Sequence, residues 1–279
     1  MVLRILITGA EGQLGRAITK QRTSEDSLFA YNSSECDILD VNKMSHLFEQ
    51  VKPDVVIHCA AYTAVDKAEI EVAKCKAINI QGSINVAEAS QKIGAKLVFF
   101  SSDYVFDGEK NGLYEVNDET KPLSIYGLTK VIAEQEICAI NTKSYIIRTS
   151  WMFGDGKNFV NTMLELAQKH KSITIVDDQI GSPTYAEDLA KFLYQLINTE
   201  KYGIYHVTNE GFCSWAELAK KIFELKNLDV TVIPITSEEY GSMAKRPKNS
   251  RLSKLSLDKN GFKRLPSWEE SLKNFLKTK

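Results

Sequence analysis

The sequence of 279 residues has little of what a membrane-bound or secreted protein needs. No uninterrupted apolar run reaches the roughly 18 residues of a membrane helix, and no small-residue cleavage site follows the apolar N-terminus, which therefore reads as a strand and not as a signal peptide. The five cysteines are an odd number without a CxxC pair, which favours reduced thiols over disulfides. We therefore expect a cytoplasmic protein that does not contact a membrane.

Metal ligands are scarce as well. The four histidines are scattered, and only His58 has a cysteine, Cys59, beside it. Consecutive side chains of a strand point to opposite faces of the sheet, so these two residues could not share a metal ion. We expect no metal site built by the protein.

Neither sign of charge dominates, but the two signs are unevenly distributed along the chain. The net charge is −1, whereas residues 240–279 carry +8 and residues 1–239 carry −9. A basic C-terminal segment has three interpretations: a solvated helical face, a nucleic-acid surface, or a pocket for a diphosphate group. Positive charge is the sole support for the second, so we expect no nucleic-acid partner.

Apolar residues are plentiful, and their spacing indicates an α/β fold. They make up 43% of the chain, enough for a full core. Apolar runs of strand length alternate with segments of helical period, of which residues 70–93 form the longest. Such alternation implies a parallel sheet with helices on both faces. The runs that we assign to its strands are residues 3–8, 28–31, 54–59, 96–100 and 145–148.

The pattern becomes less regular after residue 150. We predict a Rossmann-type doubly wound parallel sheet in residues 1–150 and a smaller α+β substrate domain in residues 151–279. Some elements near 173–207 are expected to return to the first domain. The predicted helices of this part are 157–170, 185–198, 214–226 and 268–277, and the predicted strands are 173–176, 204–207 and 230–233.

Three glycines with the spacing GxxGxxG, Gly9, Gly12 and Gly15, follow the first predicted strand and open a helix that begins at about Gln13. Glycine permits a tight turn and a close approach of the backbone to a pyrophosphate. The N-terminus of the helix then offers free N–H groups and a favourable dipole to phosphate oxygens. This arrangement predicts a dinucleotide site.

The end of the second predicted strand does not decide between NADH and NADPH. An acid about 20 residues after the glycines would hold the adenosine ribose of NAD. Residues 30–34 offer neither an acid nor an arginine, and Glu35 is expected past the strand. Asp37 and Ile38 are candidates for the adenine edge, although Asp37 could instead cap a helix that begins at about Asn42.

Tyr126 and Lys130 are four residues apart and therefore share one face of a helix. Ketone reduction needs a proton donor, and a phenol with the usual pKa of about 10 is slow in that role at neutral pH. A lysine cation nearby is expected to lower this pKa by roughly one to three units. Ser102 follows the strand 96–100, at the end where open α/β sheets place ligands. Its hydroxyl could bind the substrate carbonyl or merely cap a turn.

The glycine turn, Ser102, Tyr126 and Lys130 together resemble the extended short-chain dehydrogenase/reductase family. Further segments are similar to the branch of that family that reduces dTDP-4-dehydrorhamnose. They occur in order along nearly the whole chain, at residues 58–66, 102–108, 148–151, 178–184 and 246–250.

This resemblance implies a role for each motif. Tyr126 would donate the proton, and Lys130 would hold the nicotinamide ribose. The implied cofactor contacts are Gly12, Gln13 and Leu14 at the diphosphate, Asp37 and Ile38 at the adenine, and Ala61, Tyr62, Thr63 and Phe100 along the cofactor channel.

The resemblance also implies how a nucleotide-sugar substrate is bound. Ser102, where relatives usually carry threonine, would contact the sugar together with Asp103 and Trp151. For Trp151, packing in the core is the alternative. Arg246 would meet the nucleotide diphosphate, with help from Lys248 and Arg251, because a guanidinium binds two phosphate oxygens at once.

The implied reaction is reduction of the C4 keto group of dTDP-4-dehydro-L-rhamnose by NADPH or NADH. A reductase of another nucleotide-linked 4-keto sugar and a non-catalytic NADP-binding regulatory subunit are the alternatives. A dehydratase or epimerase is disfavoured, because Tyr104 and not a second acid follows Asp103. Some relatives bind Mg²⁺ through acids at a dimer interface. Those acids have no match here, so a homodimer stays an open alternative.

Overall fold

The computed structural model describes residues 2–21 and 26–279. Its central sheet has six parallel strands in the order β2, β1, β3, β4, β5, β10. The five strands predicted before residue 150 are confirmed to within two residues at each end, as is the predicted strand 204–207. The bounds are β1 Arg4–Thr8, β2 Ser27–Tyr31, β3 Val55–His58, β4 Lys96–Ser102, β5 Ser144–Thr149 and β10 Gly203–His206.

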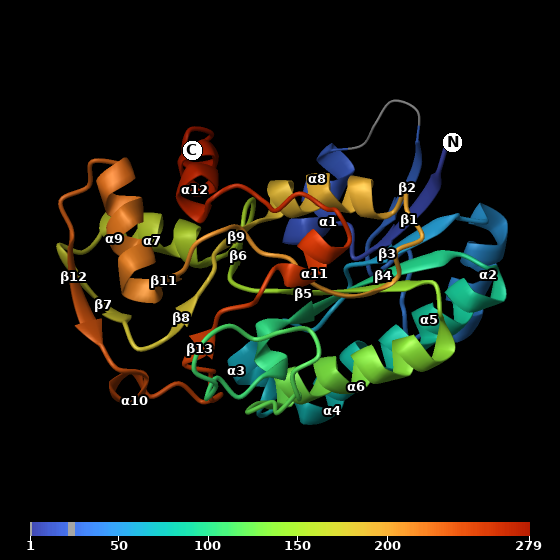
Figure 1. Ribbon diagram of the computed structural model, residues 1–279, viewed down its shortest axis with the longest axis horizontal. Coiled ribbons are helices and arrows are strands. Elements are labelled where there is room, and N and C mark those ends of the chain that lie inside the picture. The colour runs from blue at the N-terminus through green and yellow to red at the C-terminus, as the bar shows by residue number, and fades with distance from the viewer. Residues whose placement is uncertain (1, 22–25) are drawn as a thin grey trace.

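Helices cover both faces of this sheet (Figure 1). Because successive side chains of a strand alternate between the faces, Ile5 of β1 belongs to one hydrophobic cluster and Leu6 to the other. The first face is covered by α1 (Gln13–Lys20) and α8 (Ala186–Leu196), and the second by α2 (Val41–Val51), α5 (Gly82–Lys92) and α6 (Ile125–Ile140). The sequence prediction of a doubly wound α/β sheet is confirmed.

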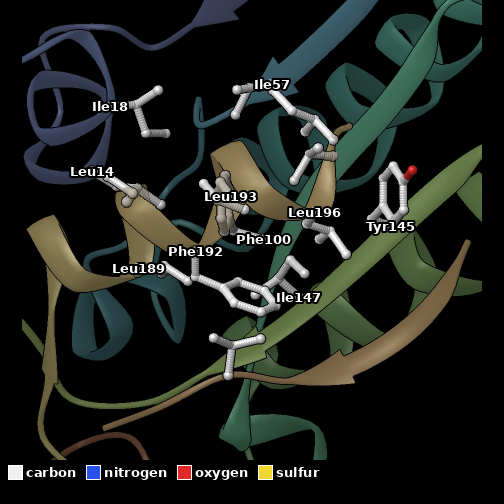
Figure 2. Close-up of a cluster of buried hydrophobic side chains, with 14 of the residues drawn as sticks. Leu14, Ile18, Ile57, Phe100, Tyr145, Ile147, Leu189, Phe192, Leu193 and Leu196 are labelled. Carbon is white, nitrogen blue, oxygen red and sulfur yellow. The ribbon is translucent and has the colours of Figure 1, made fainter. Parts of the chain in front are cut away.

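Figure 2 shows the cluster on the first face, where α1 and α8 meet the strands. Leu193 of α8 is fully buried, as are Ile57 of β3 and Ile147 of β5. Full burial of such a side chain contributes roughly 1.5–3 kcal/mol. This packing fixes α1, and with it the glycine turn, relative to the strand ends.

The long helix predicted at 70–93 runs from Val72 to Lys92 with one irregular turn. A π-helical turn (Ala77–Gln81) separates α4 (Val72–Lys76) from α5, and the short α3 (Val65–Ala68) precedes them. In this turn Asn79 is buried, and its side chain accepts a hydrogen bond from the Tyr62 N–H (2.8 Å) and donates one to the Tyr62 carbonyl (3.1 Å). The turn thus holds the backbone of the segment that follows β3.

Most elements after residue 150 pack around a separate core. The helices α7 (Phe159–Ala167), α9 (Trp215–Leu225) and α12 (Trp268–Leu276) meet there, at the left of Figure 1, and with α8 they confirm the four predicted helices. Short strands form small sheets, β7 with β12, β8 with β11 and β13, and β6 with β9. The remaining bounds are β6 Met152–Phe153, β7 Ser172–Val176, β8 Ile180–Gly181, β9 Thr184–Tyr185, β11 Cys213–Ser214, β12 Thr231–Ile235, α10 Ser237–Tyr240, β13 Asn249–Ser250 and α11 Leu255–Lys259.

Two of the elements near 173–207 return to the central sheet, as expected. Of the segments near 173–207, α8 and β10 do join the six-stranded sheet and its helical layer, but β7 pairs with β12 instead. The reason is that β12 offers β7 a parallel partner over five residue pairs. The domain boundary at residue 150 stays a prediction. Within the described residues, no helix is long and apolar enough to cross a membrane.

Candidate active site

A cavity of about 540 Å³ lies at the carboxyl ends of the central strands. The strand order reverses between β1 and β3, and ligands of open α/β sheets bind at such a point. The C-terminal region supplies the opposite wall, through residues 151–153, residues 157–160 and α9. The cavity collects most of the site residues predicted from the sequence: Gly12, Gln13, Leu14, Gly15, Ala61, Thr63, Phe100, Ser102, Asp103, Tyr126, Lys130 and Trp151.

The glycine turn is packed so tightly that side chains would collide. Gly9 has a φ of +68°, and a Cβ there would lie 2.6 Å from the backbone nitrogen of Ala60. Gly9 thus forms the base of the turn and does not line the cavity. Helix α1 then begins at Gln13, and its N-cap Gly12 provides no capping side chain. The N–H groups of this first turn and the helix dipole suit the pyrophosphate of a dinucleotide.

Tyr126 and Lys130 project from the start of α6 into the same cavity. Ser124 caps this helix by accepting a hydrogen bond from Gly127 N–H at 3.1 Å. Lys130 is 3% exposed, and its Nζ donates a hydrogen bond to the carbonyl of Phe100 at 3.0 Å. The same Nζ lies 5.9 Å from the ring centroid of Tyr126. The helix therefore fixes a phenol and an amine side by side at the end of β4.

Burial dominates the protonation of both groups. It lowers the pKa of Lys130 to about 8. It also raises the pKa of Tyr126 well above the usual value, and the carboxyl of Asp103 adds to this rise. The expectation that Lys130 lowers the pKa of Tyr126 is therefore wrong for the protein by itself, because desolvation and the Asp103 carboxyl raise this pKa and outweigh the hydrogen bond from Ser102 that lowers it. Tyr126 keeps its proton at neutral pH.

Ser102 ends β4 and caps a turn, one of the two roles that its sequence context suggested; its contact with a substrate carbonyl stays a prediction. Its Oγ accepts a hydrogen bond from Tyr104 N–H at 3.2 Å, which caps a 3₁₀ turn (Asp103–Val105), and it donates one to Asp103 Oδ1 at 2.9 Å. Asp103 is 2% exposed, and burial raises its pKa to about 6. Hydrogen bonding from Ser250 and Ser102 opposes this rise, and among the described residues the buried Oδ2 makes no hydrogen bond of normal length.

Two tryptophans from distant parts of the sequence form one wall of the cavity. Trp151 has a φ of +47°, which is rare outside glycine, and its ring stacks on that of Trp215 with centroids 3.7 Å apart. Gly181 makes room for this pair, since a Cβ there would lie 2.7 Å from the Trp151 ring. The Trp215 Nε1–H donates to Gln179 Oε1 at 3.1 Å. The positive φ of Trp151 strains the backbone, and backbone strain of this kind is characteristic of ligand sites.

Sequence reasoning missed Trp215 and Asn158. Trp215 is the first residue of α9, and no spacing in the sequence links it to Trp151. Asn158 lines the cavity and donates a hydrogen bond from its Nδ2 to Gln13 Oε1 at 2.9 Å. This bond joins the C-terminal region to the glycine turn. The one local signal for Asn158 was its helix-capping residue type before α7.

Besides Gly9, three of the predicted cofactor contacts lie outside the cavity lining. The side chain of Ile38 packs in the core against Gly82, and that of Tyr62 packs among Ala68 and Cys75. Asp37 is exposed, and its Oδ1 accepts a hydrogen bond from the backbone N–H two residues further along the chain. The side chains of Ile38 and Tyr62 are buried by contacts with distant segments, which local sequence patterns do not predict.

Capping of α2 by Asp37 is also wrong. Asp40 caps this helix by accepting a hydrogen bond from Lys43 N–H at 3.0 Å. The helix begins at Val41, one residue before the predicted Asn42. Asp40 directly precedes this first helical residue and therefore occupies the capping position.

Arg246 borders a second cavity of about 560 Å³, together with Lys248. The Arg246 guanidinium makes two hydrogen bonds to the carboxylate of Asp66 in α3, at 2.6 and 3.2 Å. Lys248 forms an ion pair with Asp178 at 3.0 Å. Arg251 does not line either cavity, and its Nε donates to Asn249 Oδ1 at 2.8 Å. Two of the three predicted phosphate ligands thus lie together.

Comparison with known proteins agrees with this geometry. The model of the family described as RmlD substrate binding domain matches residues 3–279. The dTDP-4-dehydrorhamnose reductase of Aggregatibacter actinomycetemcomitans is 41% identical over 97% of both chains. The spore coat polysaccharide biosynthesis protein SpsK of Bacillus subtilis is 40% identical over 98% of this chain and 96% of its own.

Solved structures are similar over the whole chain as well. A dTDP-4-dehydrorhamnose reductase from Bacillus anthracis, crystallised in complex with NADP, superposes with a TM-score of 0.98 at 43% identity and covers 100% of both chains. A UDP-glucose 4-epimerase from Thermus thermophilus shares the fold, with a TM-score of 0.85 at 18% identity over 99% of this chain and 98% of its own.

Proposed function

The chain belongs to the family described as RmlD substrate binding domain, and from this membership we propose that the protein reduces the C4 keto group of dTDP-4-dehydro-L-rhamnose to give dTDP-L-rhamnose. It is an oxidoreductase that uses NADPH or NADH. The observation that carries the proposal is the single cavity in which the glycine turn, Ser102, Tyr126 and Lys130 meet.

The catalytic roles follow from hydrogen-bond partners and protonation. When bound, the dihydronicotinamide supplies the hydride. Tyr126 gives its phenolic proton to the oxygen that develops at C4, and its raised pKa keeps the donor form present at neutral pH. The Ser102 hydroxyl, which donates to Asp103 in the protein by itself, would donate its one hydrogen bond to the same oxygen instead. Lys130, an ammonium below its pKa of about 8, stabilises the phenolate electrostatically and holds the nicotinamide ribose.

The sugar would lie between Asp103 and the stacked tryptophans. The carboxyl of Asp103, which lines the cavity, would accept a hydrogen bond from a sugar hydroxyl. The stacked rings of Trp151 and Trp215 offer an apolar surface to the hexose face and to its 6-deoxy methyl group. One wall thus recognises the polar edge of the sugar and the other its apolar face.

The diphosphate of the substrate would leave the first cavity toward Arg246. In the protein by itself the Arg246 guanidinium is held by Asp66, at 2.6 Å. A guanidinium binds two oxygens of a phosphate group at once, as it binds the two oxygens of a carboxylate. We therefore propose that Arg246 passes from Asp66 to the diphosphate when substrate binds, with Lys248 close by.

A reductase assay tests the proposal. The purified protein should oxidise NADPH or NADH when dTDP-4-dehydro-L-rhamnose is supplied, and Tyr126→Phe should lower kcat by about 10²- to 10⁴-fold while cofactor binding is kept. The matched control is Tyr240→Phe, because Tyr240 is 60% exposed. Rapid turnover by the Tyr126→Phe variant would refute the proton donor, and no turnover by the unmodified protein would refute the reaction.

A different nucleotide-linked 4-keto sugar is the second candidate substrate, because SpsK of Bacillus subtilis, 40% identical, is named for spore coat polysaccharide biosynthesis. Comparison of kcat/KM between such sugars separates the two candidates. We also propose a cytoplasmic location, which the five free cysteines support. A homodimer stays a prediction.

A further inference from the structure

The end of β2 meets the glycine turn at the corner where the adenosine ribose of a dinucleotide binds. The Ala10 N–H donates a hydrogen bond to the carbonyl of Tyr31 at 3.0 Å, which ties the turn to the strand end. Asn32 comes next, 20 residues after Gly12. In this fold, the residue at that place contacts the 2′-position of the ribose and discriminates between a hydroxyl and a phosphate.

Asn32 gathers two carboxylates at this corner. Its Nδ2 donates to Glu11 Oε1 at 3.1 Å, and its backbone N–H donates to Glu35 Oε2 at 2.9 Å. The Asn32 Oδ1 in turn accepts hydrogen bonds from the backbone N–H of Ser34 (2.9 Å) and of Glu35 (3.2 Å), which fixes the turn. Glu35, expected past the strand, therefore folds back onto it. Asn32 itself is uncharged, but its hydrogen bonds hold the carboxylates of Glu11 and Glu35 at this corner.

Among residues 2–21 and 26–279, no ion pair neutralises these two carboxylates. Arg16 of α1 lies beside Glu11, but its guanidinium donates to the backbone carbonyls of Glu11 and of Asp155 and not to either carboxylate. Among the hydrogen bonds and ion pairs of residues 2–21 and 26–279, none brings a lysine or arginine side chain to residues 31–35.

We propose that Glu11 and Glu35 make this protein select NADH over NADPH. A neutral 2′-hydroxyl can donate a hydrogen bond to either carboxylate, whereas a 2′-phosphate brings about −1.5 to −2 charges at neutral pH and is repelled by both. The related structure solved with NADP shows that this fold accepts a 2′-phosphate, so selectivity rests on side chains at this corner. The inference depends on the nicotinamide site of the proposed function.

Cofactor binding without sugar tests the selection directly. The dissociation constants of NADH and NADPH are measured by the fluorescence of the reduced nicotinamide, for the unmodified protein and for Glu11→Gln and Glu35→Gln. The matched control is Glu224→Gln, an exposed glutamate of α9. We expect NADH to bind at least about tenfold more tightly at low salt, a ratio that Glu11→Gln lowers about fivefold and that added salt also lowers, because exposed charges are screened.

The outcomes separate this inference from the function on which it depends. Equal affinities, tighter binding of NADPH, or a ratio that neither glutamine variant changes would overturn the selection by Glu11 and Glu35. A ratio that does not respond to salt would also overturn it, because repulsion between exposed charges must be screened. If neither cofactor binds to the unmodified protein, the nicotinamide site itself is refuted. Circular dichroism confirms that each variant is folded.

Discussion

At the scale of single residues, burial sets the charge of Lys130 more than any neighbour does. Its Nζ donates a hydrogen bond to the carbonyl of Phe100 and lies 4.8 Å from the ring centroid of Phe99. An ammonium in such surroundings loses solvation and holds its proton less tightly. The group that must stabilise the Tyr126 phenolate is therefore charged only below about pH 8.

We accordingly expect kcat/KM for ketone reduction to be nearly constant around neutral pH and to fall about tenfold per pH unit above pH 8, as Lys130 is deprotonated. The measurement is a pH profile at subsaturating sugar. Lys130→Arg, whose guanidinium stays protonated, serves as the comparison and should shift this limb to higher pH if it retains activity. A profile that stays flat up to about pH 10 would contradict the role of Lys130.

Burial of the Asp103 carboxyl destabilises the folded protein at neutral pH. Its folded-state pKa of about 6 lies above the unfolded value, so protonation stabilises the folded state. This stabilisation is fully present below about pH 4 and is lost as the pH rises through about 6.

Relative to Asp103→Asn, the free energy of unfolding of the unmodified protein should therefore fall by about 2–3 kcal/mol as the pH rises from 4 to 7. Urea denaturation at several pH values measures this difference. The asparagine variant should be the more stable one at pH 7 and the less active one, because its side chain cannot accept as a carboxylate does. Parallel stability curves for the two proteins would show that Asp103 is not the group responsible.

At the scale of elements, a buried ion pair joins the catalytic helix to the sheet. Arg148 of β5 contacts Glu134 of α6 through Nη2–Oε2 at 2.6 Å and Nε–Oε1 at 2.9 Å. Both side chains are less than 7% exposed. Glu134 lies one helical turn beyond Lys130, so the pair fixes the rotation of the face that carries Tyr126 and Lys130.

Glu134→Gln should lower the free energy of unfolding by about 3–5 kcal/mol, because it leaves a buried guanidinium without its counter-charge. The double variant Glu134→Leu with Arg148→Met should recover most of that loss, since an apolar pair of similar volume needs no desolvation of charge. Chemical denaturation measures both. A loss below about 1 kcal/mol in the single variant, the range of exposed pairs, would contradict this assignment.

At the scale of the whole molecule, the cavity lies where the sheet meets the C-terminal region, and few polar contacts cross between them at the glycine turn. The Asn158–Gln13 hydrogen bond is one, and the contact of Arg16 with the carbonyl of Asp155 is another. A cofactor on the glycine turn would touch both regions. Ligand binding should therefore stabilise the molecule as a whole.

Cofactor at about 100 times its Kd should add about 2.7 kcal/mol to the stability of the protein, seen as a rise in Tm. At the same cofactor concentration, Asn158→Ala should weaken cofactor binding and reduce that rise in Tm, with a smaller effect on the ligand-free Tm. Asn260→Ala is the matched control, because Asn260 donates to Ser256 in α11, whose residues do not line the cavity. An unchanged ligand-induced rise in the Asn158→Ala variant would exclude its part in the cofactor site.

The sequence by itself determined the parallel sheet, the glycine turn and the shared face of Tyr126 and Lys130. Each of these depends on neighbours within a few residues, such as the alternation of apolar runs, the need for a positive φ at Gly9, and the spacing of a helical turn. Ser102 could be placed as well, because a residue that follows a parallel strand must lie at the ligand-binding end of the sheet.

Only the tertiary structure decided which side chains reach the cavity and in what state of charge. The pKa of Tyr126 is raised and not lowered, because desolvation depends on everything packed around the ring. The stack of Trp151 on Trp215 and the return of Glu35 to Asn32 likewise arise from folding. The reason is physical: burial and contacts between distant segments come from the packed chain, and local spacing does not contain them.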